Sequence, residues 1–160
     1  MAEKFCQSLH AKLKNAFRLI EDTLLKFSPG QWLRGEDAFQ VPAKICCHIL
    51  DALDDYFRPS PNGRYPWGHR FGSGWWELTE KDLPSPQALL TYFQELEDHV
   101  QRTFFHDLTD ADLSEPFDKP KEHSETRLSH FVYALRHTMH HHGALSLLSL
   151  QFANPEGIWQ

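Results

Sequence analysis

Apolar residues recur at alternating spacings of three and four in several long segments, and this periodicity limits the chain to folds built from packed helices. Such spacing puts one apolar stripe on a helix, and that stripe has to be buried against a neighbour. Pro42 and Pro86 stand where two of these helices would begin, because a missing N–H costs nothing in the first turn. We therefore expect an all-α fold with helices over about residues 2–27, 42–57, 86–108 and 124–152.

Length and composition describe one ordinary globular domain. The chain has 160 residues, of which 41% are apolar and 24% are charged. A chain of this length and composition can bury a hydrophobic core without stabilisation by disulfides or a metal. A formal net charge of -6 argues against nonspecific binding to nucleic acid or to an anionic membrane. We expect residues 1–160 to form a single domain whose partners are small molecules or proteins.

The sequence also predicts where the protein resides. It has no apolar run of about 18 residues that could span a membrane, and its first residues lack the apolar region of a signal peptide. The three cysteines include the adjacent pair Cys46 and Cys47, which suits reduced thiols better than a disulfide framework. We expect a cytoplasmic protein in which these two thiols line the core.

Four histidines lie in the segment 136–143, inside the last expected helix. His137 and His141 are four residues apart, so their imidazoles lie on one helix face, close enough to bind one metal ion. His141 shares its face with Leu145 and Leu148, whereas His140 lies on a more polar arc. We therefore predict that His137 and His141 are the metal ligands, and the pair His137 and His140 is the fallback.

A third ligand has to come from another helix, and His48 is the best candidate. It lies between Ile45 and Ile49 on the apolar face of the second expected helix, where an imidazole is unusual. Three histidines from two helices would leave a divalent metal ion with an open coordination position. Zinc, nickel and iron all suit such a ligand set. The pattern assigns no catalytic residue beyond these ligands.

Three aspartates follow His48 in the same expected helix. Asp51, Asp54 and Asp55 are most simply interpreted as its solvated face. Asp51 lies one turn from His48, so an alternative role is to accept a hydrogen bond from that imidazole and orient it.

Residues 58–86 lack helical periodicity but are rich in tryptophan, proline and glycine. This composition is too aromatic for a disordered linker, and it predicts an ordered loop that covers one end of the domain. Arg64 and Arg70 in this loop are candidate substrate-binding residues, because a guanidinium pairs well with a carboxylate.

The last expected helix carries a second apolar stripe, displaced around the axis from the one that holds His141. The neighbour of this stripe is either the first helix or a second copy of the chain, and the second alternative predicts a homodimer. The stripe consists of Leu128, Phe131, Val132, Leu135 and Met139.

The histidine segments resemble those of a known family. His48 within residues 44–50, and the spacing of His137, His140, His141 and Gly143, are similar to the signature of the DinB-like (DNA-damage-inducible) superfamily. These proteins are metal-binding four-helix bundles related to low-molecular-weight-thiol S-transferases. The resemblance implies an up-up-down-down order with a long crossover loop between helices 2 and 3, a homodimer, and a divalent metal on His48, His137 and His141. Ala144 departs from the family, whose members often have Gln after the glycine.

Two functions compete for such a chain. The first is a metal-dependent enzyme that activates a thiol or water, of the thiol S-transferase or hydrolase type, with a small-molecule substrate and a low-molecular-weight thiol as the resemblance implies. The second is a non-catalytic metal-binding or stress-response protein. A fourth protein ligand such as His140 or Cys47 would favour a structural metal, whereas an open position favours catalysis.

Overall fold

A computed structural model describes residues 4–58, 66–117 and 125–153. These ranges contain α-helices and short 3-10 helices and no β-strand, which confirms the all-α expectation. None of the described helices is both long and apolar enough to cross a membrane. The α-helices are α1 Lys4–Leu24, α2 Pro29–Trp32, α3 Pro42–Phe57, α4 Pro86–Thr103 and α5 Arg127–Ala153, and the 3-10 helices are η1 Ala38–Gln40, η2 Glu80–Asp82 and η3 Asp112–Ser114.

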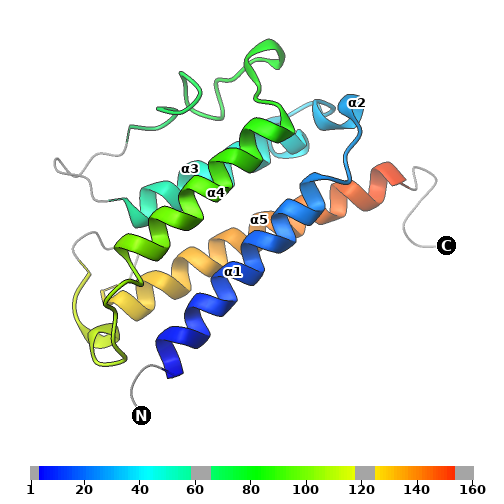
Figure 1. Cartoon of the computed structure of the whole chain (residues 1–160). Coiled ribbons are helices and arrows are strands. Elements are labelled where there is room, and N and C mark those ends of the chain that lie inside the picture. The colour runs from blue at the N-terminus through cyan, green and yellow to red at the C-terminus, as the bar shows by residue number, and fades with distance from the viewer. Residues whose placement is uncertain (1–3, 59–65, 118–124, 154–160) are drawn as a thin grey trace.

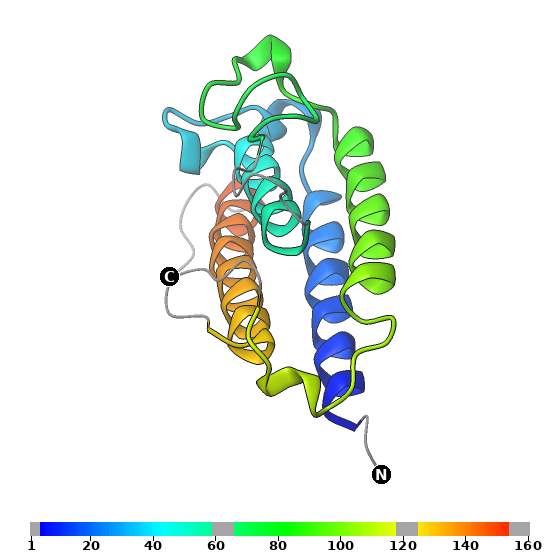
Figure 2. The same ribbon diagram turned by 90° about the vertical axis from the view of Figure 1, so that its left-hand side faces the viewer.

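The four long helices lie side by side (Figure 1). Helix α1 packs against α4 and α5, and α3 packs against the same two helices. Two views show that α1 and α5 run in one direction and that α3 and α4 run in the other (Figures 1 and 2). The first two long helices are therefore antiparallel, which differs from the up-up-down-down order that the resemblance implied. The connection between α1 and α3 explains this direction. Residues 25–41 form the short helices α2 and η1, and α3 begins near the end of α1 (Figure 1).

Local capping explains where two of the helices begin. The Ser85 hydroxyl accepts a hydrogen bond from the Ala88 N–H at 3.2 Å, and Pro86 occupies the first turn of α4, as expected. At α2, the Ser28 hydroxyl accepts from the Gln31 N–H, while the Gln31 side chain accepts from the Ser28 N–H at 2.9 Å. This reciprocal pair is a capping box, and the sequence analysis predicted no helix there.

Helix α3 lies at the centre of the hydrophobic core. Of its 16 residues, 14 are buried, and its apolar side chains join one buried cluster with residues of α1, α4 and α5. Cys46 and Cys47 are free, buried thiols within this cluster, as expected. Burial raises the pKa of both thiols. A thiol that stays protonated in an apolar core is a poor nucleophile or ligand.

The three aspartates of α3 are buried, and their interpretation as a solvated face is wrong. Asp51, Asp54 and Asp55 are all at most 1% exposed. Asp54 accepts two hydrogen bonds from Arg58, at 2.8 and 3.0 Å, and one from the Tyr92 hydroxyl at 2.7 Å. Hydrogen bonds of this kind offset the cost of removing a carboxylate from water. Because Tyr92 belongs to α4, the pattern within α3 gave no sign of this partner.

The second apolar stripe of α5 is buried at some of its residues and exposed at others. Phe131 is fully buried, and its ring lies 5.7 Å from that of Phe105 after the end of α4. Val132 is 51% exposed. Part of the stripe is thus covered within the chain, and a second copy that covers the rest stays a prediction.

The loop before α4 is ordered by specific contacts in its described part, residues 66–85. The indole N–H of Trp32 donates to the Pro84 carbonyl at 3.0 Å, which ties the loop to α2. Gly68 has a φ of 75°, and a Cβ at this position would lie 2.0 Å from the backbone carbonyl oxygen of Ser73. Only glycine fits that close approach.

Replacing Gly68 by Ala should lower the melting temperature, because the added methyl group collides with backbone. The matched change Gly143→Ala lies in α5, where a Cβ meets nothing within 4 Å. It should raise the free energy of unfolding by about 1 kcal/mol, since alanine favours a helix over glycine. Thermal and urea unfolding of both variants measure the difference. Equal effects at the two sites would contradict the loop geometry.

Candidate metal centre

The three predicted ligands lie together, between α3 and α5. The Nε2 atom of His48 is 3.2 Å from Nε2 of His137 and 3.0 Å from Nε2 of His141. One nitrogen from each ring belongs to a group within 4.8 Å that could hold a metal ion. For metal–nitrogen bonds of about 2.0–2.1 Å, tetrahedral geometry separates two ligand nitrogens by about 3.3 Å. The donor atoms are therefore already close to the spacing that a bound ion requires.

Burial keeps the three imidazoles neutral. Desolvation lowers the pKa of His48 to about 3, with further lowering by His141 and His137. Desolvation also lowers the pKa of His137 and of His141 to about 4, and the neighbouring His140 lowers both further. At neutral pH each ring therefore offers a lone pair, which is the form that binds metals.

The convergence of the three Nε2 atoms also fits a cation. The Nδ1 atoms of His48 and His137 are buried and have no hydrogen-bond partner in the part of the chain that the structure describes. If the lone pairs lie on the converging Nε2 atoms, they repel one another, and a divalent ion would satisfy all of them at once. The alternative role of Asp51 is not observed, because His48 Nδ1 has no hydrogen-bond partner among the described residues.

Aromatic rings from two irregular segments cover the three histidines. The Phe39 ring of η1 is stacked on His141, with centroids 5.5 Å apart and planes 10° apart. The loop before α4 is called the aromatic loop below, and its Trp75 ring lies 4.5 Å from the His48 ring, measured between centroids. Tyr56 of α3 lies edge-on to His137 at 5.5 Å. The sequence analysis expected the aromatic loop near a binding site but missed Phe39, whose only signal was an aromatic residue shortly before the helix of His48.

The remaining histidines of α5 take other roles. His140, the fallback ligand, is exposed and lies outside the metal-competent group. His142 faces α1, where its Nε2 is 3.1 Å from the Thr23 hydroxyl. His130 is a buried core residue whose Nε2 donates to the Tyr56 carbonyl at 2.8 Å. Within residues 4–58, 66–117 and 125–153, no fourth His, Cys, Asp or Glu joins the three ligands.

The contacts of the described residues do not link the candidate substrate-binding arginines to the three histidines. Arg64 lies outside the described residues. The Arg70 guanidinium donates to Glu95 at 2.8 Å and lies 5.2 Å from the centroid of the Tyr92 ring. Glu95 and Tyr92 belong to α4, so Arg70 lies on the α4 side of the core. Substrate binding by these arginines stays a prediction.

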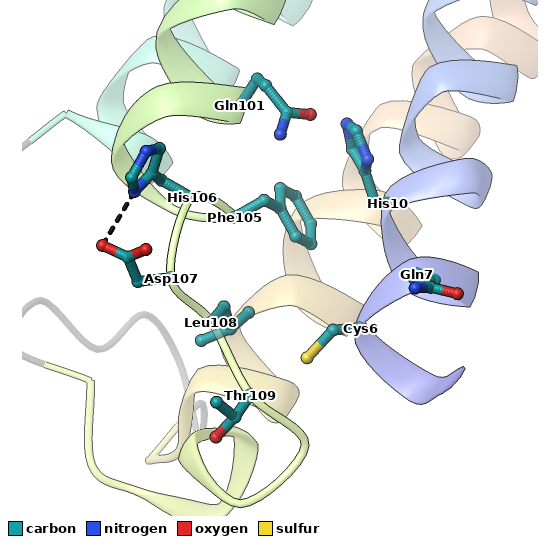
Figure 3. A pocket seen from close by; sticks show the side chains of 9 residues that line it. All are labelled: Cys6, Gln7, His10, Gln101, Phe105, His106, Asp107, Leu108 and Thr109. Carbon is teal, nitrogen blue, oxygen red and sulfur yellow. Dashed lines mark ion pairs between the residues drawn. The ribbon is translucent and has the colours of Figure 1, made fainter. Parts of the chain in front are cut away.

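A separate hollow of about 380 Å³ lies between the start of α1 and the segment that follows α4 (Figure 3). The His10 ring lies against Phe105 there, with centroids 4.8 Å apart. His106 and Asp107 pair with each other at 2.8 Å, on the side away from His10 (Figure 3). Among the described residues these groups form no second metal-competent cluster.

Comparison with known proteins assigns the family. The DinB superfamily matches residues 11–145, a range that includes His48, His137 and His141. The chain therefore belongs to the DinB superfamily, which confirms the resemblance seen in the histidine segments. No curated protein and no solved structure matches the chain.

The metal-free protein should lose stability as the pH falls from about 7 to about 5. In this range the unfolded histidines, with pKa near 6.5, bind protons that the folded triad excludes, so the unfolded state gains protons and is favoured. Urea unfolding across this range measures the slope of stability against pH.

Replacing His48 with Ala should flatten this slope, whereas replacing the exposed His140 should change it less. A slope unaffected by His48→Ala would contradict the burial of a neutral imidazole at that position.

Proposed function

We propose that this protein is a metal-dependent enzyme that activates a thiol or a water molecule, in a reaction of the thiol S-transferase or hydrolase type. One observation carries the proposal: three Nε2 atoms from two helices converge, and the described residues supply no fourth ligand. Structural zinc sites are usually closed by four side chains, whereas a three-ligand site leaves room for a reactant. Zinc, nickel and iron are all compatible with three imidazoles.

The chain's own residues have three tasks in this proposal. His48, His137 and His141 hold the ion and, being neutral, leave its full charge available. An ion held in this way would lower the pKa of a thiol or a water molecule bound at its open position. The rings of Phe39 and Trp75 lie against His141 and His48 and limit the access of bulk water, which strengthens electrostatic interactions in the site.

Substrate is proposed to enter past Phe39, because this ring contacts His141 and is still 48% exposed. The substrate is proposed to be a small molecule, because the side chains of a single domain surround the site. A low-molecular-weight thiol is one candidate reactant, as the resemblance to the superfamily implied.

Metal analysis tests the site. Tag-free protein should hold about one divalent ion per chain after dialysis, and His48→Ala and His137→Ala should each lose it because two imidazoles bind far more weakly. His140→Ala is the matched control, since this exposed histidine of α5 lies outside the group, and it should keep the ion. Circular dichroism checks that every variant remains helical.

The open position is tested in cobalt-substituted protein. Adding a small thiol such as 2-mercaptoethanol should change the visible absorption of the cobalt, because sulfur enters the free position. Folded protein that takes up no zinc, nickel or iron would overturn the metal site. A bound cobalt whose spectrum does not respond to any thiol would instead favour the non-catalytic metal-binding protein.

A further inference from the structure

A groove of about 680 Å³ extends along the C-terminal half of α5. Leu147, Leu148 and Phe152 of α5 line one side, and the segment around η1 lines the other. In Figure 2 the turn that carries η1 lies beside the orange and red end of α5. A volume of this size is typical of small-molecule sites, and the groove's α5 wall is largely apolar.

Phe39 joins this groove to the metal centre. Its ring lines the groove and also stacks on His141 at 5.5 Å and lies edge-on to His48 at 5.8 Å. Ala144, three residues after His141, lines the groove as well, and its small side chain takes little of the space next to the centre. A molecule bound in the groove would thus have one of its ends at Phe39, the ring that lies against two of the metal ligands.

The other end of the groove carries a positive charge. The Arg34 guanidinium lies 5.5 Å from the centroid of the Phe152 ring. Phe152 follows His141 by 11 residues, which is about 16 Å along a helix axis. Arg34 is exposed, and no ion pair of the described residues involves it. A guanidinium that rests on an aromatic face keeps its in-plane donors available for a carboxylate.

We propose that this groove is the substrate site of the metal centre and that it takes an elongated carboxylate with an apolar body. The carboxylate pairs with Arg34, the body lies along Leu147 and Leu148, and the reactive end lies at Phe39 and His141. Glu36 lines the same groove and has no ion pair in the described ranges either. Its charge disfavours a second negative group, so the substrate is a monoanion. The role as substrate site rests on the proposed function, but carboxylate binding does not require the metal.

Titration of metal-free protein with octanoate, followed by NMR, tests the charge selectivity. Arg34→Gln should weaken octanoate binding about tenfold, the loss expected for one charge-assisted hydrogen bond, and Glu36→Gln should strengthen it. Octylamine, which has a matched chain and the opposite charge, should bind less tightly than octanoate. Tighter binding of octylamine, or unchanged affinity in Arg34→Gln, would overturn the proposal.

Two further variants test the path of the chain. Ala144→Leu adds bulk beside His141, so it should weaken octanoate but leave the shorter butyrate unchanged. Leu150→Ala removes an exposed apolar side chain of α5 that is not in the groove, and it should change neither. Equal effects of the two substitutions on octanoate would contradict the assigned path.

Orientation is read from cobalt-loaded protein, because a paramagnetic ion relaxes the nearest protons most strongly. The terminal methyl group of octanoate should relax faster than the methylene next to the carboxylate. The reverse order would put the carboxylate on the metal and overturn the proposal. Protein that takes up no metal would overturn the proposed function and the substrate role with it, whereas a metal-loaded protein without Arg34-dependent binding would overturn only this inference.

Discussion

The packing of α3 against α5 is the constraint on which the site depends. It puts the Nε2 atom of His48 in α3 at 3.2 Å from that of His137 and at 3.0 Å from that of His141, both in α5. Such an arrangement of buried polar groups is costly unless the lone pairs are satisfied. His48 itself is half-buried, but most of α3 is buried and packs against α4 and α5, so the packing of this helix fixes the position from which the His48 imidazole projects.

Polar contacts of its buried aspartates also hold α3 in place. Asp54 binds Arg58, the residue that follows α3, and Tyr92 of α4, and His69 of the aromatic loop lies 3.3 Å from it. Burial, together with the nearby Asp54 carboxylate, raises the pKa of Asp51 to about 7, and the backbone of Gly68 in the same loop opposes this shift. These contacts tie the loop to the helix that carries His48. The loop in turn brings Trp75 to that histidine.

Features set by local sequence were predictable. The bounds of α3 agree with the sequence analysis because Pro42 and the apolar period are contained in the segment itself. The three histidines were found from a four-residue spacing and one imidazole on an apolar face. The capping box of Ser28 and Gln31 is equally local and could have been found from its spacing. Helix direction, the burial of Asp54 and the place of Phe39 depend on partners far along the chain, such as Tyr92, 38 residues from Asp54, and no pattern within one segment reports them.

X-ray absorption spectroscopy of the metal-loaded protein tests the central claim most directly, because it identifies the atoms bound to the ion. The account predicts three imidazole nitrogens at about 2.0–2.1 Å and one light, exchangeable atom, with sulfur at about 2.3 Å appearing only after a thiol is added. Four protein ligands, or sulfur from Cys47 in the absence of added thiol, would contradict an open three-histidine centre.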